Sequence, residues 1–185
     1  MVVLIAALHA LCLTGSQLPA VLGVDGKRHQ PLIEAQGKPS IFVFISHDCP
    51  VCNVYAPELG RIEARFGSKF AFHLVYSEPR ITADVAKQHA KSYKIDHAKL
   101  LLDNDCRFAA ASGAKVTPEV VIFNAQGRSV YKGRIDDRYY GIGQQRPVAT
   151  KHDTIEALEA VLSNQSPKPA AGLPVGCFIL PPTKS

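Results

Sequence analysis

The chain of 185 residues is 46% hydrophobic and 20% charged, with a formal net charge of +5. This size favours one domain with a sizeable core and tails over two domains. Because Lys and Arg are scattered rather than clustered, the charge indicates an ordinary solvated surface and argues against a nucleic-acid-binding protein. The five cysteines are an odd number, which argues against a disulfide scaffold and favours a redox or metal role for the one close pair.

The N-terminal segment 1–16 lacks Lys, Arg, Asp and Glu, and carries the apolar run Val2–Leu13 followed by small residues. A membrane-spanning helix needs about 20 apolar residues, so a cleaved export signal is the favoured interpretation. It predicts an exported protein, periplasmic or otherwise extracytoplasmic, that touches a membrane only through this segment if the signal is uncleaved. The alternative is an N-terminal strand or helix of the core. A lipid anchor on Cys12 is disfavoured because the bulky Leu11 precedes it.

Three elements are predicted in the first third of the domain. Residues 18–32 contain short β runs around an Asp-Gly turn, which predicts a small β ribbon. The continuous apolar run Ile41–Ile45 predicts a buried central strand. In Asn53–Phe66 the apolar residues recur at helical spacing, so a helix follows this strand directly.

Cys49 and Cys52 stand where this strand turns into this helix. Free backbone N–H groups and the positive end of the helix dipole stabilise an anion there, so we expect the pKa of Cys49 to lie below the ordinary thiol value. A low-pKa thiolate followed three residues later by a second thiol is typical of a dithiol redox pair. Half of a zinc site has the same spacing. Cys106 and Cys177 have no close partner to complete such a site.

Strands and helices alternate through the rest of the domain. Strands are predicted at 70–76 and 99–102, on either side of a helix over 83–93 that Thr82 caps. A brief helix capped by Asn104 or Asp105 follows, then a β-hairpin over 116–135 and an amphipathic helix from about residue 153. The polar and aromatic run 134–140 is expected to be a surface loop of salt bridges. This order predicts an α/β sandwich with a mixed sheet.

The chain becomes rich in proline and glycine after Ser163. We therefore expect a signal segment at 1–16, one domain at 17–163 and a tail at 164–185. Cys177 lies in this tail, where it would swing back to the active site, pair with another protein, or dock with its apolar neighbours on a sheet edge. Cys106, at a predicted helix start, is expected to be either partly activated or inert.

These features together resemble the thioredoxin-like superfamily, and specifically its exported bacterial redoxin group. The resemblance rests on the Cys-Pro-Val-Cys sequence at 49–52, on Pro57 five residues later, and on Thr117-Pro118 before the hairpin. Redoxin-like motifs also occupy 49–58, 117–119, 133–137 and 176–179, so the similarity covers nearly everything from Leu18 onward. It implies a thioredoxin-like three-layer sandwich with a central mixed sheet, an N-terminal β-hairpin, and an insertion around 77–102.

The resemblance also implies an activity, that of a thiol-disulfide oxidoreductase. Cys49 would be the exposed nucleophile, and Cys52 would resolve the mixed disulfide. Pro118 would be a cis-proline, with the backbone of Thr117 pairing with the extended chain of a substrate. The implied partners are protein thiols or disulfides and an upstream redox donor or acceptor. No organic cofactor is expected, because the chain has no Gly-rich dinucleotide fingerprint.

His47 and Glu119 are the other candidate site residues. As an imidazolium, His47 would stabilise the thiolate of Cys49, and a solvated loop residue is the alternative. Thioredoxins keep a buried acid six residues before the first cysteine, where this chain has Val43. Glu119 is the best substitute as a proton acceptor for Cys52, and an exposed carboxylate at a strand end is the alternative.

Two other function classes share parts of this pattern. A peroxiredoxin-like thiol peroxidase, with Cys49 as the peroxidatic cysteine, is suggested by Ser46 three residues before it. Peroxiredoxins, however, carry a proline where this chain has Phe42 and an arginine where their hairpin begins. A copper-binding module would use the thiolates with His47. Copper-delivery relatives of this fold have three residues between their cysteines, whereas this chain has two.

Overall fold

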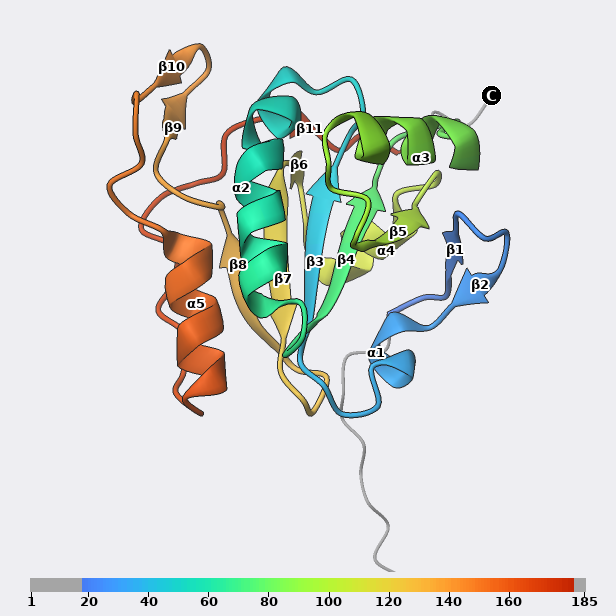
Figure 1. Ribbon diagram of the computed structural model, residues 1–185, viewed down its shortest axis with the longest axis horizontal. Helices are drawn as coiled ribbons and strands as arrows, with labels where there is room; N and C mark the ends of the chain where they lie inside the picture. The colour runs from blue at the N-terminus through green and yellow to red at the C-terminus, as the bar shows by residue number, and fades with distance from the viewer. Residues whose placement is uncertain (1–17, 182–185) are drawn as a thin grey trace, which may run out of the picture.

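The computed structural model describes residues 18–181. They form a seven-stranded mixed sheet, ordered β2-β1-β5-β4-β3-β7-β8, with helices on both faces (Figure 1). The α/β fold class expected from the sequence is confirmed. The export signal expected at 1–16 lies outside the described residues. Between residues 18 and 181, no helix is long and apolar enough to cross a membrane.

The elements follow one another in a strand-helix alternation. The strands of the main sheet are β1 (Val21–Gly23), β2 (Arg28–His29), β3 (Ser40–Ile45), β4 (Ala71–Tyr76), β5 (Lys99–Leu102), β7 (Glu119–Phe123) and β8 (Ser129–Gly133). The helices are α1 (Pro31–Glu34), α2 (Pro50–Phe66), α3 (Ala83–Ser92), α4 (Arg107–Ser112) and α5 (Asp153–Leu162). Two small antiparallel pairs complete the structure: β9 (Tyr139–Gly141) with β10 (Gln144–Gln145), and β6 (Val116–Thr117) with β11 (Cys177–Phe178).

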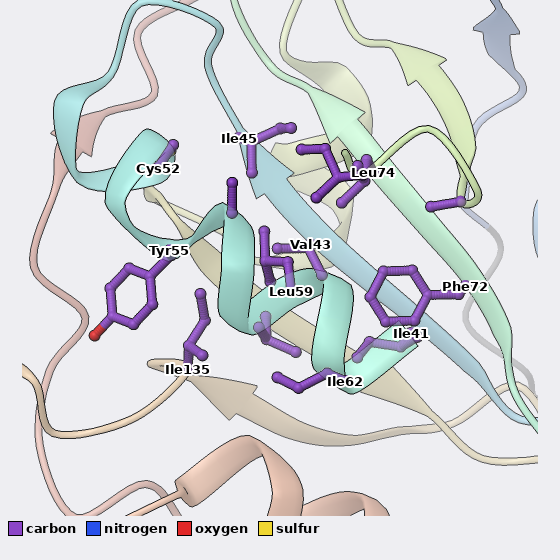
Figure 2. Packing of buried hydrophobic residues seen from close by; sticks show 14 of the residues in the cluster. Ile41, Val43, Ile45, Cys52, Tyr55, Leu59, Ile62, Phe72, Leu74 and Ile135 are labelled. Carbon is purple, nitrogen blue, oxygen red and sulfur yellow. The ribbon is translucent and has the colours of Figure 1, made fainter. Parts of the chain in front are cut away.

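Strand β3 lies in the interior of the sheet, parallel to β4 on one side and antiparallel to β7 on the other. Side chains alternate across a strand, so Val43 and Ile45 pack under α2 against residues such as Leu59 (Figure 2). Phe42 and Phe44 face the opposite side, which α4 covers. Because both faces are buried, β3 appears in the sequence as an unbroken apolar run, as predicted.

Helix α4 receives its N-terminal cap from a residue that the sequence did not indicate. The carboxylate of Asp103 accepts the backbone N–H groups of Phe108 and Ala109 at 3.0 and 2.8 Å. Of the two expected caps, Asp105 contributes one contact, since its carboxylate accepts the backbone N–H of Arg107 at 3.3 Å, whereas the Asn104 side chain donates to the Ile81 carbonyl. Asp103 is buried at the end of β5, where its carboxylate faces the free N–H groups of the first helical turn.

The polar run 134–140 is also not the surface loop that was expected. Asp136 and Asp137 are both buried. Asp136 accepts hydrogen bonds from the Tyr55 hydroxyl and the Arg138 amide, at 2.6 and 2.8 Å. Asp137 accepts three hydrogen bonds, from Thr150 and from the amide of residue 151. Buried carboxylates require such partners. Here these hydrogen bonds connect the segment after β8 to α2 and to the residues just before α5.

The C-terminal tail docks on the body of the domain. After α5 the chain returns along β8 and ends beside β6, as the red segment of Figure 1 shows. The Ala171 amide donates to the carboxylate of Asp153 at 2.9 Å, and Ala170 and Val175 pack against the core. The described part of the tail is therefore folded back onto the domain. Through β11 it brings Cys177 to the first turn of α2, as in the alternative in which Cys177 returns to the active site.

Candidate active site

Cys49 and Cys52 lie in the first turn of α2, at the end of the central strand. Cys49 is the N-cap residue and Pro50 takes the first helical position, so the helix starts three residues before the predicted Asn53. Pro57 lies inside the same helix, where the resemblance placed it. The side chains are buried, with Cys49 1% and Cys52 3% exposed. The expectation of an exposed Cys49 is thus wrong, because the C-terminal tail covers it.

The two thiols have pKa values shifted in opposite directions. A hydrogen bond from the Cys52 thiol lowers the pKa of Cys49 to about 4 in spite of burial, and the Cys177 thiol and the Cys52 backbone amide act in the same direction. Burial raises the pKa of Cys52, and the nearby Cys49 thiolate adds to the effect. At neutral pH the reduced pair therefore consists of a thiolate nucleophile and a protonated second thiol.

The Thr117–Pro118 segment forms the wall facing Cys49. The peptide bond between these residues is cis. The sulfur of Cys49 lies 3.3 Å from the carbonyl oxygen of Thr117, although the two residues are 68 positions apart. The structure thus brings together four of the six predicted site residues, Cys49, Cys52, Thr117 and Pro118.

A third cysteine from the tail joins this group. The Sγ of Cys177 lies 3.0 Å from the Sγ of Cys49 and donates a hydrogen bond to it. Strand β11 holds it there by antiparallel pairing with β6, in which Cys177 is opposite Thr117. The pKa of Cys177 is raised to about 11, chiefly because its thiol proton is bound by the Cys49 thiolate.

His47 lies at the rim of the site, with its side chain 41% exposed. Its Nδ1 is 2.8 Å from Glu78, and its backbone N–H donates to the same carboxylate at 3.0 Å. The Ser46 hydroxyl also donates to Glu78, at 2.7 Å, and pairs with Asp48. Glu78 therefore positions the loop that leads into Cys49. It was missed in the sequence, although it follows β4, the parallel neighbour of β3, and so emerges at the same sheet edge.

A second network lies between α2 and α3. The Asn53 amide group donates to the carbonyl of His47, and its oxygen is 2.9 Å from Nε2 of His89. Nδ1 of His89 is 2.9 Å from the Tyr76 hydroxyl. A neutral His89 can donate from Nε2 to Asn53 and leave Nδ1 facing the Tyr76 hydroxyl, which also lies 3.2 Å from the Ala86 carbonyl oxygen. Burial lowers the pKa of His89, which favours this neutral form.

Glu119 is not brought to Cys52. It is opposite Phe44 in the β3–β7 ladder, so its side chain lies on the face of the sheet away from α2. Its carboxylate accepts the backbone N–H groups of Lys115 and Val116. Glu119 is 4% exposed, so it is neither a proton acceptor for Cys52 nor an exposed carboxylate. It anchors the loop before the cis peptide bond.

Cys106 is separate from this site. It is buried before α4, and burial together with Asp103 and Asp105 raises its pKa to about 11. Of the two expectations for Cys106, the structure supports the inert thiol. Among the described residues, the two clusters of three metal-ligating side chains are His47 with Asp48 and Glu78, and Glu58 with Asp136 and His152. Neither contains a cysteine, so among the described residues the alternative copper site does not form a three-ligand cluster of thiolates and His47.

Comparison with known proteins agrees with this geometry. The sequence profile of the thioredoxin-like domain matches residues 29–139, more than half of the chain. The chain belongs to the thioredoxin-like family. The match spans the dithiol, the Thr117–Pro118 wall, α3 and β5, so these parts of the structure belong to the thioredoxin-like domain itself. Helix α5 and the tail that carries Cys177 follow it.

Solved structures of the same fold come from several bacteria. A conserved uncharacterised protein of Geobacillus kaustophilus is 24% identical, with a TM-score of 0.78 over 92% of this chain and 93% of that one. A hypothetical protein of Sinorhizobium meliloti is 21% identical, with a TM-score of 0.73 over 90% and 92%. A secreted disulfide oxidoreductase of Mycobacterium tuberculosis is 20% identical, with a TM-score of 0.57 over 80% and 97%. No curated protein matches the sequence.

Proposed function

We propose that this thioredoxin-like protein is a thiol-disulfide oxidoreductase that exchanges disulfides with protein substrates. The observation that carries the proposal is the Cys49–Cys52 pair at the start of α2, in which Cys49 is a thiolate and Cys52 a buried thiol. The solved disulfide oxidoreductase of M. tuberculosis, which shares the fold, adds support.

The reaction has two thiol-disulfide exchange steps. The Cys49 thiolate attacks one sulfur of a substrate disulfide, which forms a bond between Cys49 and the substrate and releases the first substrate thiolate. Cys52 then gives up its proton and attacks Cys49 Sγ, which releases the second substrate thiolate. The substrate gains two electrons and the Cys49–Cys52 pair loses them. A second redox protein would reset the pair, and the reverse sequence would oxidise a substrate.

The substrate would lie along the backbone of Thr117. That backbone already forms antiparallel pairing with β11, so it can bind an extended strand next to Cys49. We place the reaction outside the cytoplasm, on the basis of the apolar segment 1–16. Two solved relatives of this fold are described as a secreted oxidoreductase and an exposed lipoprotein thioredoxin.

Reduction of insulin disulfides by the full chain, driven by dithiothreitol, tests the proposal. Cys49→Ser should remove the catalysed rate, and Cys52→Ser, which lacks the resolving thiol, should lower it. The matched control is Cys106→Ser, which changes a buried thiol outside the site and should retain the rate. Catalysis that survives Cys49→Ser would refute the proposal.

A peroxidase assay covers the alternative. Fast peroxide consumption retained in Cys52→Ser, with a sulfenic acid trapped on Cys49, would assign the protein to the thiol peroxidases instead. The structure does not favour this outcome, because the Ser46 hydroxyl is bound to the carboxylates of Glu78 and Asp48 rather than to the sulfur of Cys49.

A further inference from the structure

The tail occupies the same backbone edge that a substrate strand would need. Residues 177 and 178 pair with Thr117 and Val116, and the amide of Ile179 donates to the Lys115 carbonyl at 2.9 Å. The pairing therefore continues for two residues after Cys177 and helps to fix the position of its side chain. This strand comes from a segment that is 60 residues away from β6 in the sequence.

Gly176 shows how closely the tail approaches this edge. A Cβ atom at this position would be 1.9 Å from the Thr117 carbonyl oxygen and 3.1 Å from Pro118 Cδ. Both neighbours belong to a buried backbone turn, which cannot move aside as a flexible side chain would. Glycine at 176 is therefore a requirement for the seating of Cys177 against Cys49.

The sulfur atoms are close enough to exchange partners after a small movement. The Cys177–Cys49 separation of 3.0 Å is about 1 Å longer than a disulfide bond. The pKa of Cys177 is raised mainly by its hydrogen bond to the Cys49 thiolate. When Cys49 is in a disulfide with Cys52, that negative charge is absent, and Cys177 can form a thiolate more readily.

We propose that Cys177 is a third redox cysteine, which attacks the Cys49–Cys52 disulfide at Cys49 and forms a Cys49–Cys177 disulfide. The inference rests on the proposed dithiol function. The Cys49–Cys177 bond forms as the Cys49–Cys52 bond breaks, and Cys52 leaves as a thiolate that takes up the proton lost by Cys177. No electrons are gained or lost, so no external oxidant is needed. In the oxidised protein, some molecules thus carry the Cys49–Cys52 disulfide and the others carry the Cys49–Cys177 disulfide. The Cys49–Cys177 disulfide holds the tail over the Thr117 backbone, where a substrate would pair.

The first experiment detects the bond itself. The full-length Cys52→Ser protein is equilibrated with reduced and oxidised glutathione, alkylated, digested without reduction and analysed by mass spectrometry. Glutathione supplies the oxidation, because Cys49 first forms a mixed disulfide with it and Cys177 then displaces it. We expect a peptide pair joined through Cys49 and Cys177 within one chain. Cys49 joined only to glutathione at every ratio, with Cys177 free, would overturn the proposal.

The second experiment tests the geometry with all the remaining cysteines in place. In the Cys52→Ser background, Gly176→Ala pushes the tail away from Thr117, and we expect the effective concentration of Cys177 at Cys49 to fall about tenfold or more. The control is Gly60→Ala, where the nearest atom to an added Cβ is 3.6 Å away and the linkage should be unchanged. Equal linkage in Gly176→Ala and its parent would overturn the role of the docked tail.

Insulin reduction by the wild-type chain separates this inference from the proposed function. Insulin reduction without any Cys49–Cys177 linkage would refute the third redox cysteine and leave the oxidoreductase in place. Cys49–Cys177 linkage without insulin reduction would refute the oxidoreductase and leave the internal disulfide as a property of the chain.

Discussion

The hydroxyl of Tyr55 on α2 donates a 2.6 Å hydrogen bond to the carboxylate of Asp136 after β8, across 81 residues of sequence. Both groups are buried, and burial raises the pKa of Tyr55, so the hydroxyl stays protonated. Tyr55→Phe leaves the buried carboxylate one partner short and should lower the free energy of unfolding by about 1–3 kcal/mol. Urea unfolding of the reduced protein measures this change.

Tyr140→Phe is the matched control for that substitution. Tyr140 is 57% exposed, so loss of its hydroxyl should change the unfolding free energy by no more than about 0.5 kcal/mol. Equal effects of the two substitutions would show that the Tyr55–Asp136 bond adds nothing to stability.

The low pKa of Cys49 predicts a pH dependence of stability. In the unfolded chain the thiol keeps its proton up to its ordinary value of 9.0, whereas the folded protein holds a thiolate above about 4. Between these values the unfolded state binds more protons, so this thiol adds stability as pH rises and the contribution is lost as pH falls through about 4. The slope for one proton is at most about 1.4 kcal/mol per pH unit.

Urea unfolding of the reduced protein at pH 5, 6, 7 and 8 tests this dependence. The difference between wild type and Cys49→Ser should widen steadily as pH rises, because serine does not titrate there. Packing changes caused by the substitution shift all four points equally. A constant difference across the four pH values would show that Cys49 is not a thiolate in the folded protein.

The cap of α4 offers a comparison of two nearby carboxylates. Asp103→Ala removes the acceptor for two backbone N–H groups and should cost about 1–3 kcal/mol of stability. Asp105→Ala removes an exposed ion pair with Arg107 and one exposed acceptor for the Arg107 amide, and should cost less than about 1 kcal/mol. Thermal unfolding of both variants shows which carboxylate contributes more to the cap of α4. A larger loss for Asp105→Ala would return the capping role to the residue expected from the sequence.

Glu78 is predicted to hold the loop before Cys49. Glu78→Gln removes the charge that binds the His47 ring, the His47 amide and the Ser46 hydroxyl, and should lower stability by about 1–3 kcal/mol. Hydrogen exchange at the His47 amide should become faster. Glu159→Gln, which alters an exposed pair with Arg65, is the control and should leave that amide unaffected. Unchanged exchange in Glu78→Gln would exclude this positioning role.

Local sequence was enough to predict the features that depend on neighbours in the chain. The apolar run of β3 and the dithiol after it are visible within a dozen residues, and Thr117-Pro118 is a local signature as well. The position of Glu78 depends on the parallel register of β3 and β4, which no single segment contains. The face on which Glu119 lies follows from its pairing with Phe44, so the alternation of β7 alone did not reveal it.

The place of Cys177 was left open in the sequence for a similar reason. The proline- and glycine-rich residues after α5 carry no periodic pattern that fixes a direction for the chain. Their course depends on single contacts with distant parts of the domain, such as the Ala171 amide bound to Asp153. Only the folded structure shows that these contacts end with β11 beside β6.

If protein substrates pair along Thr117, as proposed, the pairing of β11 with β6 makes the tail a tethered competitor of the incoming strand. A segment tethered to the domain is present at its own binding site at about millimolar effective concentration or higher. A free substrate binds only in the fraction of molecules whose tail is away, and its apparent affinity falls by that fraction. Under the proposed function, proteins that only pair along Thr117 would then be selected against. Those with additional contacts around the site would displace the tail, so the C-terminus would act as a filter on substrate choice.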